Sequence, residues 1–313
     1  MSPYAERPAL AGALRQPRQM LAAQTYGGHE SIHDDAMAAK LGFRAGPIEG
    51  PTHFSQFEPL LFELWGPAWF ERGCISAHYQ NMVIEGESVR AFVAQPAAGE
   101  THTRIWAEKA DGTPVLMGTA SLGPDHGATE IEGRITRLRP PGPLVVLAGL
   151  QVGQRGAVAR ERVRMGFDDP MGDHYPFTLA HKLAVITEPN PWFTREHGAS
   201  SPWGRAIIPF EMISVLLGTS IEQAGFSAKQ PSVGLFAGQQ IKLVAGPLFV
   251  DHPYELEREI VALSESARTE STWVRTRVFD GHTQALAAEM ILNSAVLKAS
   301  YPRYEEEAKA LGR

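Results

Sequence analysis

The chain has 313 residues, of which 43% are hydrophobic and 20% are charged, and this composition excludes a disordered or a fibrous protein. The net charge of −6 comes without a basic stripe, which argues against nucleic acid as the main partner. Cys74 is the only cysteine, so neither an intrachain disulfide nor a thiolate metal cluster can form. The length suggests roughly two domains.

The N-terminal segment, residues 1–24, alternates Arg, Pro and Ala without an apolar centre, which is not the pattern of a signal peptide. We interpret it as an arm on the surface. The sequence contains no run of about 18 apolar residues, so no membrane span is predicted. A chain without disulfides fits a reducing compartment, and the expected location is the cytoplasm.

An apolar helix is predicted over residues 52–65, because large apolar side chains recur there at spacings of three or four residues. Pro59 removes one backbone donor and predicts a kink or a late start. Strands are predicted at residues 74–84, 89–94, 103–109 and 115–122. Asp111-Gly112 favours a hairpin between the last two, since both residues accept the dihedral angles of a tight turn.

The second half repeats this order. An apolar helix is predicted over residues 210–224, and strands follow at 232–244, 254–263, 272–279 and 284–297. Asp280-Gly281 falls where Asp111-Gly112 fell in the first half. A helix followed by four strands, twice, indicates two copies of one module.

Both predicted helices are apolar around most of their circumference and must be covered on more than one side. A curved antiparallel sheet wrapped around a long central helix provides that cover, which predicts the α+β class. The expected units are an arm (1–24), a first module (25–138), a proline-rich linker (139–153) and a second module (154–313). Pairing of the modules edge to edge would cover exposed sheet edges. The alternative is an α+β chain of two unrelated domains.

Two segments carry halves of one motif. Residues 26–50 contain Ile32-His33, and residues 187–209 contain Asn190-Pro191. Both segments resemble the MaoC-like, R-specific enoyl-CoA hydratase family of double hotdog proteins, whose motif reads Gly-Asp-x-Asn-Pro-(Leu/Ile/Val)-His. At the place of the family's aspartate this chain has Gly28 in the first half and Glu188 in the second; Phe193 stands at the place of the second histidine.

The resemblance implies a double hotdog fold and a lyase of the hydratase or dehydratase type. Such an enzyme adds or eliminates water, or a related group, next to an activated carbonyl, here expected to be an acyl thioester. It implies a small-molecule acyl substrate, possibly CoA-linked, no cofactor, and a homodimer. The alternatives are a hotdog thioesterase, in which Glu58 activates water, and a non-catalytic subunit that binds acyl-CoA.

His33 is the expected catalytic imidazole, and it needs a carboxylate in place of the missing aspartate. Three neighbours are candidates: Glu30, Asp34 and Asp35. An Asp/His pair that holds water and moves a proton is worth about 10²–10⁴ in rate. Asp34 and Asp35 have a second interpretation, as the cap and first turn of a short helix over residues 36–41.

Substrate binding is expected at the start of the first helix, where unpaired N–H groups can polarise a thioester oxygen. Gly50, Thr52 and His53 occupy this start, and Tyr26 is a candidate hydrogen-bond or proton donor. In the second half, Glu188 and Asn190 are either a second site or a loop anchor. No metal site is predicted, because the acidic residues of 168–174 lack the spacing of known ligand sets.

Overall fold

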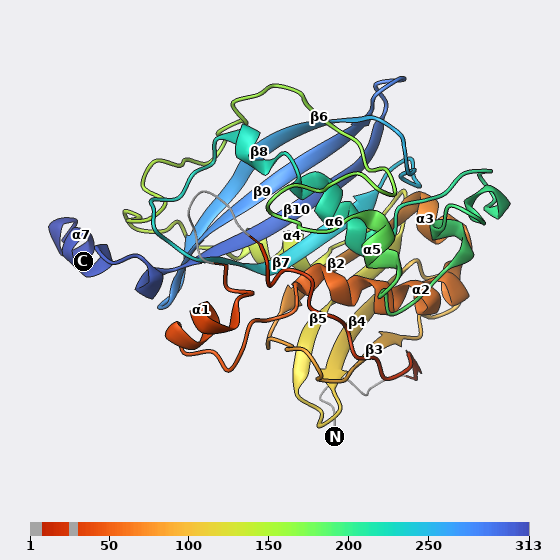
Figure 1. Ribbon diagram of the computed structural model, residues 1–313, viewed down its shortest axis with the longest axis horizontal. Helices are drawn as coiled ribbons and strands as arrows, with labels where there is room; N and C mark the ends of the chain where they lie inside the picture. The colour runs from red at the N-terminus through yellow and green to blue at the C-terminus, as the bar shows by residue number, and fades with distance from the viewer. Residues whose placement is uncertain (1–7, 25–30, 313) are drawn as a thin grey trace.

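The computed structural model describes residues 8–24 and 31–312, and Figure 1 shows its arrangement. The described residues form a single ten-stranded antiparallel sheet in the order β1-β3-β4-β5-β2-β7-β10-β9-β8-β6. The strands of the first half are β1 (Ala9–Ala11), β2 (Gly73–Tyr79), β3 (Val89–Ala94), β4 (His102–Lys109) and β5 (Pro114–Leu122). Those of the second half are β6 (Glu161–Val163), β7 (Gly234–Leu243), β8 (Tyr254–Glu265), β9 (Thr269–Asp280) and β10 (Leu286–Leu297).

The two halves of the sheet mirror each other, since β3-β4-β5-β2 corresponds to β8-β9-β10-β7. They meet where β2 pairs with β7, from Cys74 opposite Lys242 to His78 opposite Gly238. Each strand predicted from the sequence is present. The predicted strand 74–84 ends early, at Tyr79, because the N–H groups of Gln80 and Asn81 both turn to the carbonyl of Val115.

The outer edges of the sheet are covered by short strands. β1 pairs with β3, so part of the predicted arm is a strand of the sheet, and β6 pairs with β8. Further along the arm, Leu21 is buried in the main core. Covering both edges in this way limits the unpaired N–H and C=O groups that could recruit another chain.

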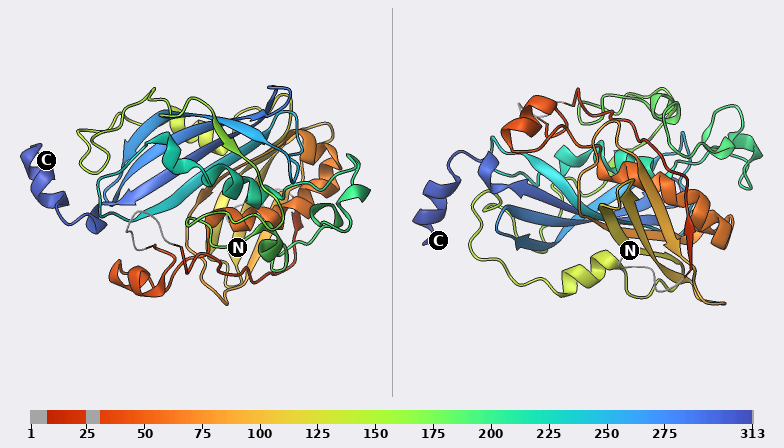
Figure 2. Two further views of the ribbon diagram at one scale, coloured as in Figure 1. Left: turned by 45° about the horizontal axis from the view of Figure 1, so that its top comes forward. Right: turned by 90° about the horizontal axis from the view of Figure 1, so that it is seen from below.

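Two helical segments lie on one face of the sheet, and Figure 2 shows α4 on the opposite face. The first predicted helix is two pieces, a 3-10 helix η1 (Gly50–Phe57) and an α-helix α2 (Glu58–Trp65). Pro59 occupies the first turn of α2, where its missing N–H has no intrahelical partner to lose. The second predicted helix, residues 210–224, is also divided into two pieces. These are the α-helix α6 (Phe210–Gly218) and the 3-10 helix η4 (Ile221–Ala224).

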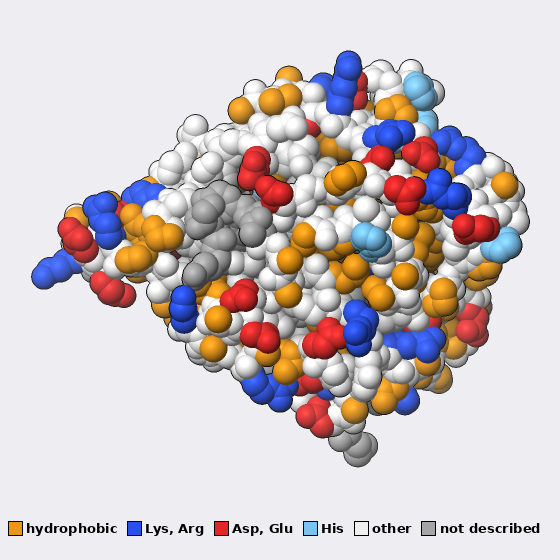
Figure 3. All heavy atoms as spheres, in the orientation of Figure 1, with side chains coloured by type: hydrophobic (Ala, Val, Ile, Leu, Met, Phe, Trp, Pro, Cys, Tyr) orange, Lys and Arg blue, Asp and Glu red, His pale blue; other side chains and the backbone are white. Residues whose placement is uncertain are grey.

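The remaining helices are short. They are α1 (Asp35–Lys40), α3 (Ala68–Arg72), α4 (Glu130–Thr136), α5 (Leu179–Leu183), η2 (Pro191–Phe193), η3 (Gly198–Ser200), η5 (Lys298–Ser300) and α7 (Tyr304–Ala310). None of the described helices is long and apolar enough to cross a membrane. Lys and Arg side chains on the face shown in Figure 3 are interspersed with Asp and Glu instead of forming a stripe.

The helical layer joins the two halves. The carboxylate of Glu58 in α2 accepts a hydrogen bond from the N–H of Phe210 at the start of α6, at 2.8 Å. The rings of Trp69 and Phe210 stack with centroids 4.7 Å apart, and Phe70 packs beside them. This aromatic group belongs to the main core.

The linker is held against the second half by one buried carboxylate. Glu270 in β9 accepts hydrogen bonds from the backbone N–H groups of Val145, Val146 and Leu147, at 2.9–3.0 Å. Its Oε1 also accepts from the hydroxyl of Tyr304 in α7, at 3.1 Å. The predicted linker is therefore a fixed part of the second half from residue 144 onward, where Leu144–Leu147 are buried.

Candidate functional site

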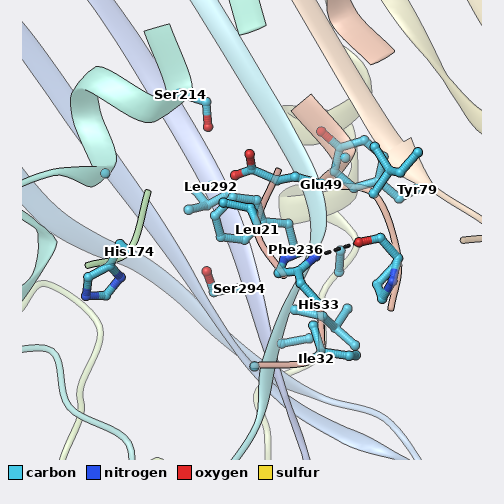
Figure 4. A pocket seen from close by; sticks show the side chains of 18 of the residues that line it. Leu21, Ile32, His33, Glu49, Tyr79, His174, Ser214, Phe236, Leu292 and Ser294 are labelled. Atoms are coloured by element: carbon cyan, nitrogen blue, oxygen red, sulfur yellow. Dashed lines mark hydrogen bonds between the residues drawn. The ribbon is translucent and has the colours of Figure 1, made fainter. Parts of the chain in front are cut away.

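A cavity of about 410 Å³ lies between α6 and the strands of the second half, with one wall from the first half. Its volume is within the range of small-molecule sites, about 300–1,000 Å³. Most of the lining is apolar and comes from α6, η4, β7, β9 and β10: Leu217, Ile221, Phe236, Val274, Met290 and Leu292. Figure 4 shows two of these side chains, Phe236 and Leu292, in the wall of the pocket.

Polar side chains gather on the wall from the first half, and local hydrogen bonds place them. Asp34 caps α1 by accepting from the N–H of Met37, at 2.9 Å. Asp35 accepts from the N–H of Gly46, at 2.8 Å, which closes the loop and brings Pro47 beside His33. A Cβ at position 46 would lie 2.1 Å from the carbonyl oxygen of His33, so only glycine fits there.

His33 lines the cavity with a defined tautomer. Its Nδ1 lies 2.6 Å from the carbonyl oxygen of Pro47, as the dashed line in Figure 4 marks. A carbonyl only accepts, so Nδ1 carries the proton and Nε2 keeps a lone pair. Burial lowers the pKa of His33, although the Pro47 hydrogen bond opposes this. At neutral pH the ring is therefore a neutral base.

Glu49 lines the same cavity, directly before η1, and is buried. Burial raises the pKa of its carboxyl to about 7; the nearby charge of Lys182 opposes this rise and that of Glu211 adds to it. The hydroxyl of Tyr175 lies 3.4 Å from Glu49 Oε1. A carboxyl with such a pKa can both give and take a proton near neutral pH.

A buried ion pair lies close to Glu49. Lys182 Nζ in α5 is 3.4 Å from Glu211 Oε2 in α6 and 3.2 Å from the hydroxyl of Thr52. Both charged side chains are almost fully buried. Burial raises the pKa of Glu211, and the contact with Lys182 opposes this. The Lys182–Glu211 pair therefore places the ammonium group of Lys182 near Glu49 while that group stays buried.

His53 and Tyr79 complete the polar wall. Burial lowers the pKa of His53 to about 4, and the charges of Lys182 and Lys109 lower it further, so the ring stays neutral. The ring of Tyr79 lies against the backbone of Gly50, where a Cβ would be 2.4 Å from Tyr79 Cζ. A side chain at position 50 would therefore have to displace this ring.

Neither a protein-family model nor a curated protein matches the sequence. Among solved structures, the chain is similar to a conserved hypothetical protein from Mycobacterium tuberculosis described as having a double hotdog fold. The identity is 12%, the coverage is 91% of this chain and 96% of that chain, and the TM-score is 0.51. The mirrored strand order and the helical layer agree with that similarity. This chain is a double hotdog protein.

Two further structures are similar to this double hotdog protein. One is a MaoC-like dehydratase, with 14% identity, 84% of this chain and 87% of that chain covered, and a TM-score of 0.47. The other is an (R)-hydratase from A. caviae involved in PHA biosynthesis, with 24% identity, 47% and 95% coverage, and a TM-score of 0.33. The similarity to the mycobacterial protein, together with the strand order, confirms the predicted double hotdog fold.

The structure brings together three of the site residues predicted for the first half. His33, Gly50 and His53 all line the cavity, and Thr52 lies behind it as a partner of Lys182. Asp34 and Asp35 are not among the lining residues and have the loop contacts described above. Tyr26 and Glu30 lie outside the described residues.

The predicted second site has structural contacts instead of a cavity. Glu188 accepts from Arg15 Nε and Nη2, at 2.6 and 2.9 Å, and Asn190 caps η2 by accepting from the N–H of Trp192, at 2.9 Å. Phe193, at the place of the family's histidine, is buried and packs edge-on against Phe70. In the double hotdog protein these residues anchor a loop and fill the aromatic core.

Sequence reasoning missed Glu49, Tyr79, Lys182 and Glu211. Glu49 had a visible signal, since it directly precedes the predicted helix start at Gly50-Pro51. Tyr79 lies within the predicted strand 74–84, and its position there gives no indication of a cavity. Lys182 and Glu211 come from separate helices about 30 residues apart, and only packing brings them together.

Proposed function

We propose that the protein is a hydro-lyase that adds water to, or removes it from, the carbon–carbon double bond next to an acyl thioester. One observation supports this above all others. A neutral imidazole with a free Nε2, on His33, and a carboxyl with a pKa of about 7, on Glu49, line the wall of one largely apolar cavity. General acid–base chemistry without a cofactor needs such a pair.

In the hydration direction, His33 Nε2 takes a proton from a water molecule. The water oxygen forms a bond to the β-carbon, the carbon–carbon π bond breaks, and the Glu49 carboxyl gives its proton to the α-carbon. The imidazolium then returns a proton to the Glu49 carboxylate, so one water is consumed and both groups are restored. Dehydration runs the same steps in reverse, and because both groups lie on one wall, the addition is expected to be syn.

Glu49 is our choice for the carboxylate that the motif lacks. Asp34 and Asp35 hold the loop that positions His33, and Glu30 stays the alternative partner. The apolar part of the substrate would lie along the strands of the second half, with its thioester at Gly50. The resemblance at residues 26–50 supports CoA as the carrier and a homodimer, and the single cysteine supports a cytoplasmic location.

The test follows the enoyl absorbance of crotonyl-CoA and trans-2-decenoyl-CoA with purified protein. We expect hydration by the wild type, and a loss of about 10²–10⁴ in kcat for each of His33→Gln and Glu49→Gln. Asp34→Asn is the matched control, because asparagine caps a helix as well as aspartate does, and it should keep activity within a few fold.

Three results would contradict this assignment in different ways. Loss of activity in Glu30→Gln with full activity in Glu49→Gln would move the carboxylate role to Glu30. Release of free thiol without loss of the double bond would indicate a thioesterase. Binding of decanoyl-CoA without either reaction would indicate an acyl-CoA-binding subunit.

A further inference from the structure

The hydroxyl of Tyr79 is a buried polar group in the wall of the cavity. Tyr79 lines the cavity, and its Oη has no hydrogen-bond partner among the residues that the structure describes. Buried hydroxyls in proteins are almost always paired, because an unpaired one loses its hydrogen bonds to water on folding. A buried, unpaired phenol in the wall of a cavity therefore points to a ligand atom as its partner.

The ring is held firmly at the start of η1. Tyr79 is the last residue of β2, where it pairs with Leu116, and its ring lies 6.4 Å from the ring of Phe54, centroid to centroid. On the other side it touches Gly50, which has no side chain. Strand and helix together leave the phenol little freedom, as an oriented hydrogen-bond donor requires.

The backbone at this helix start is short of donors. Pro51 has no N–H, and the N–H of Thr52 donates to the carbonyl of Glu49, at 3.1 Å. Among the first three residues of η1, the backbone contacts above leave the N–H of Gly50 for a substrate oxygen. An oxygen that gains negative charge is usually stabilised by more than one donor. The ring of Tyr79 lies against Gly50, so a second donor from this side chain would be close to the first.

We propose that the Tyr79 hydroxyl and the Gly50 N–H together bind the thioester carbonyl oxygen, and that Tyr79 stabilises the negative charge this oxygen gains during reaction. Burial raises the pKa of Tyr79 well above its ordinary value, and the charge of Glu49 raises it further, so the phenol keeps its proton. This assignment rests on the proposed function, because it takes an acyl thioester as the substrate.

The variant Tyr79→Phe removes only the hydroxyl. If that group donates to the substrate in the transition state, kcat for trans-2-decenoyl-CoA falls about 10²-fold while KM changes little. The melting temperature stays the same or rises, since an unpaired hydroxyl adds nothing to folding. Tyr301→Phe is the matched control. Its hydroxyl pairs with Glu307 outside the cavity, and its loss should leave kcat unchanged.

A second readout does not depend on turnover. The infrared band of the thioester carbonyl is recorded for bound decanoyl-CoA carrying ¹³C at that carbon. A hydrogen-bonded carbonyl absorbs at lower frequency, so the band should lie lower in the wild type than in Tyr79→Phe. Tyr301→Phe should match the wild type.

The two readouts separate this proposal from the proposed function. If the wild type lacks hydratase activity but the band shifts in Tyr79→Phe, the reaction assignment fails and the oxygen-binding role stands. If the wild type hydrates the substrate while neither kcat nor the band changes in Tyr79→Phe, the role of Tyr79 is refuted and the reaction stands. Failure of decanoyl-CoA to bind refutes both.

Discussion

Glu49→Gln should change the pH dependence of folding as well as turnover. The carboxyl of Glu49 has an ordinary pKa of 4.5 that burial raises to about 7 in the folded protein. The folded state therefore holds this proton more tightly than the unfolded chain. Its contribution to stability is fully present below about pH 4.5 and is lost as the pH rises through about 7. Glutamine has no such proton to lose.

The size of the effect follows from the displacement of the pKa. A change from 4.5 to about 7 corresponds to about 3.5 kcal/mol in full, at about 1.4 kcal/mol for each pH unit. Part of this contribution is already lost at pH 5, so Glu49→Gln should gain about 2.5 kcal/mol in free energy of unfolding, relative to wild type, between pH 5 and pH 8. Any constant cost of the buried amide cancels in this difference.

Urea unfolding of both proteins at half-unit steps from pH 5 to pH 8 measures this difference, because other titrating groups affect both proteins alike. Asp34→Asn is a suitable control for loss of an acidic side chain, since Asp34 is a helix cap on the loop. A difference between Glu49→Gln and wild type that stays flat within about 0.5 kcal/mol would show that the Glu49 carboxyl is not held neutral by its surroundings.

Three further outcomes are expected. The hydration rate should fall at alkaline pH with an apparent pKa near 7, because Glu49 loses the proton that it donates. The residual rate of Glu49→Gln should not show this fall. A wild-type rate that is constant from pH 6 to pH 9 would contradict the prediction. Gly50→Ala should fold but lose at least tenfold in kcat/KM, because its Cβ would come within 2.4 Å of Tyr79 Cζ and displace the ring. A fully active variant would show that the contact between Gly50 and the Tyr79 ring is dispensable. Glu270→Gln should lower the free energy of unfolding by about 1–3 kcal/mol, since the carboxylate of Glu270 accepts hydrogen bonds from three backbone N–H groups and a hydroxyl. Calorimetry would detect this loss. An unchanged melting temperature would argue against the linker contact.

Both halves line the cavity. The first half supplies His33 and Glu49, and the second half supplies most of the apolar lining. The position that corresponds to His33 in the second half is Phe193, which packs into the aromatic core between the halves. An imidazole at that place would be buried in the core at a cost in stability, whereas the phenylalanine ring packs there.

The sequence by itself determined the class and the layout. Alternating and helical apolar patterns predicted the strands from β2 to β10, apart from the short β6, and located both helical segments, because burial on one face leaves a periodic signal in a single segment. It also selected His33 and Gly50, which line the cavity, since the half-preserved motif and the helix start are both local features. Pro59 predicted a kink or a late start in the first helix, and α2 begins at Glu58, whereas the break between α6 and η4 was not predicted.

Only the tertiary structure shows which carboxyl lines the same cavity as the imidazole. Asp34 and Asp35 are next to His33 in the chain, yet backbone N–H groups take up their side chains, whereas Glu49 reaches the cavity from 16 residues away. The pKa of Glu49 depends on Lys182 and Glu211, which come from two other helices. Burial and long-range charge leave no periodic trace in a sequence, because they arise where distant segments pack together.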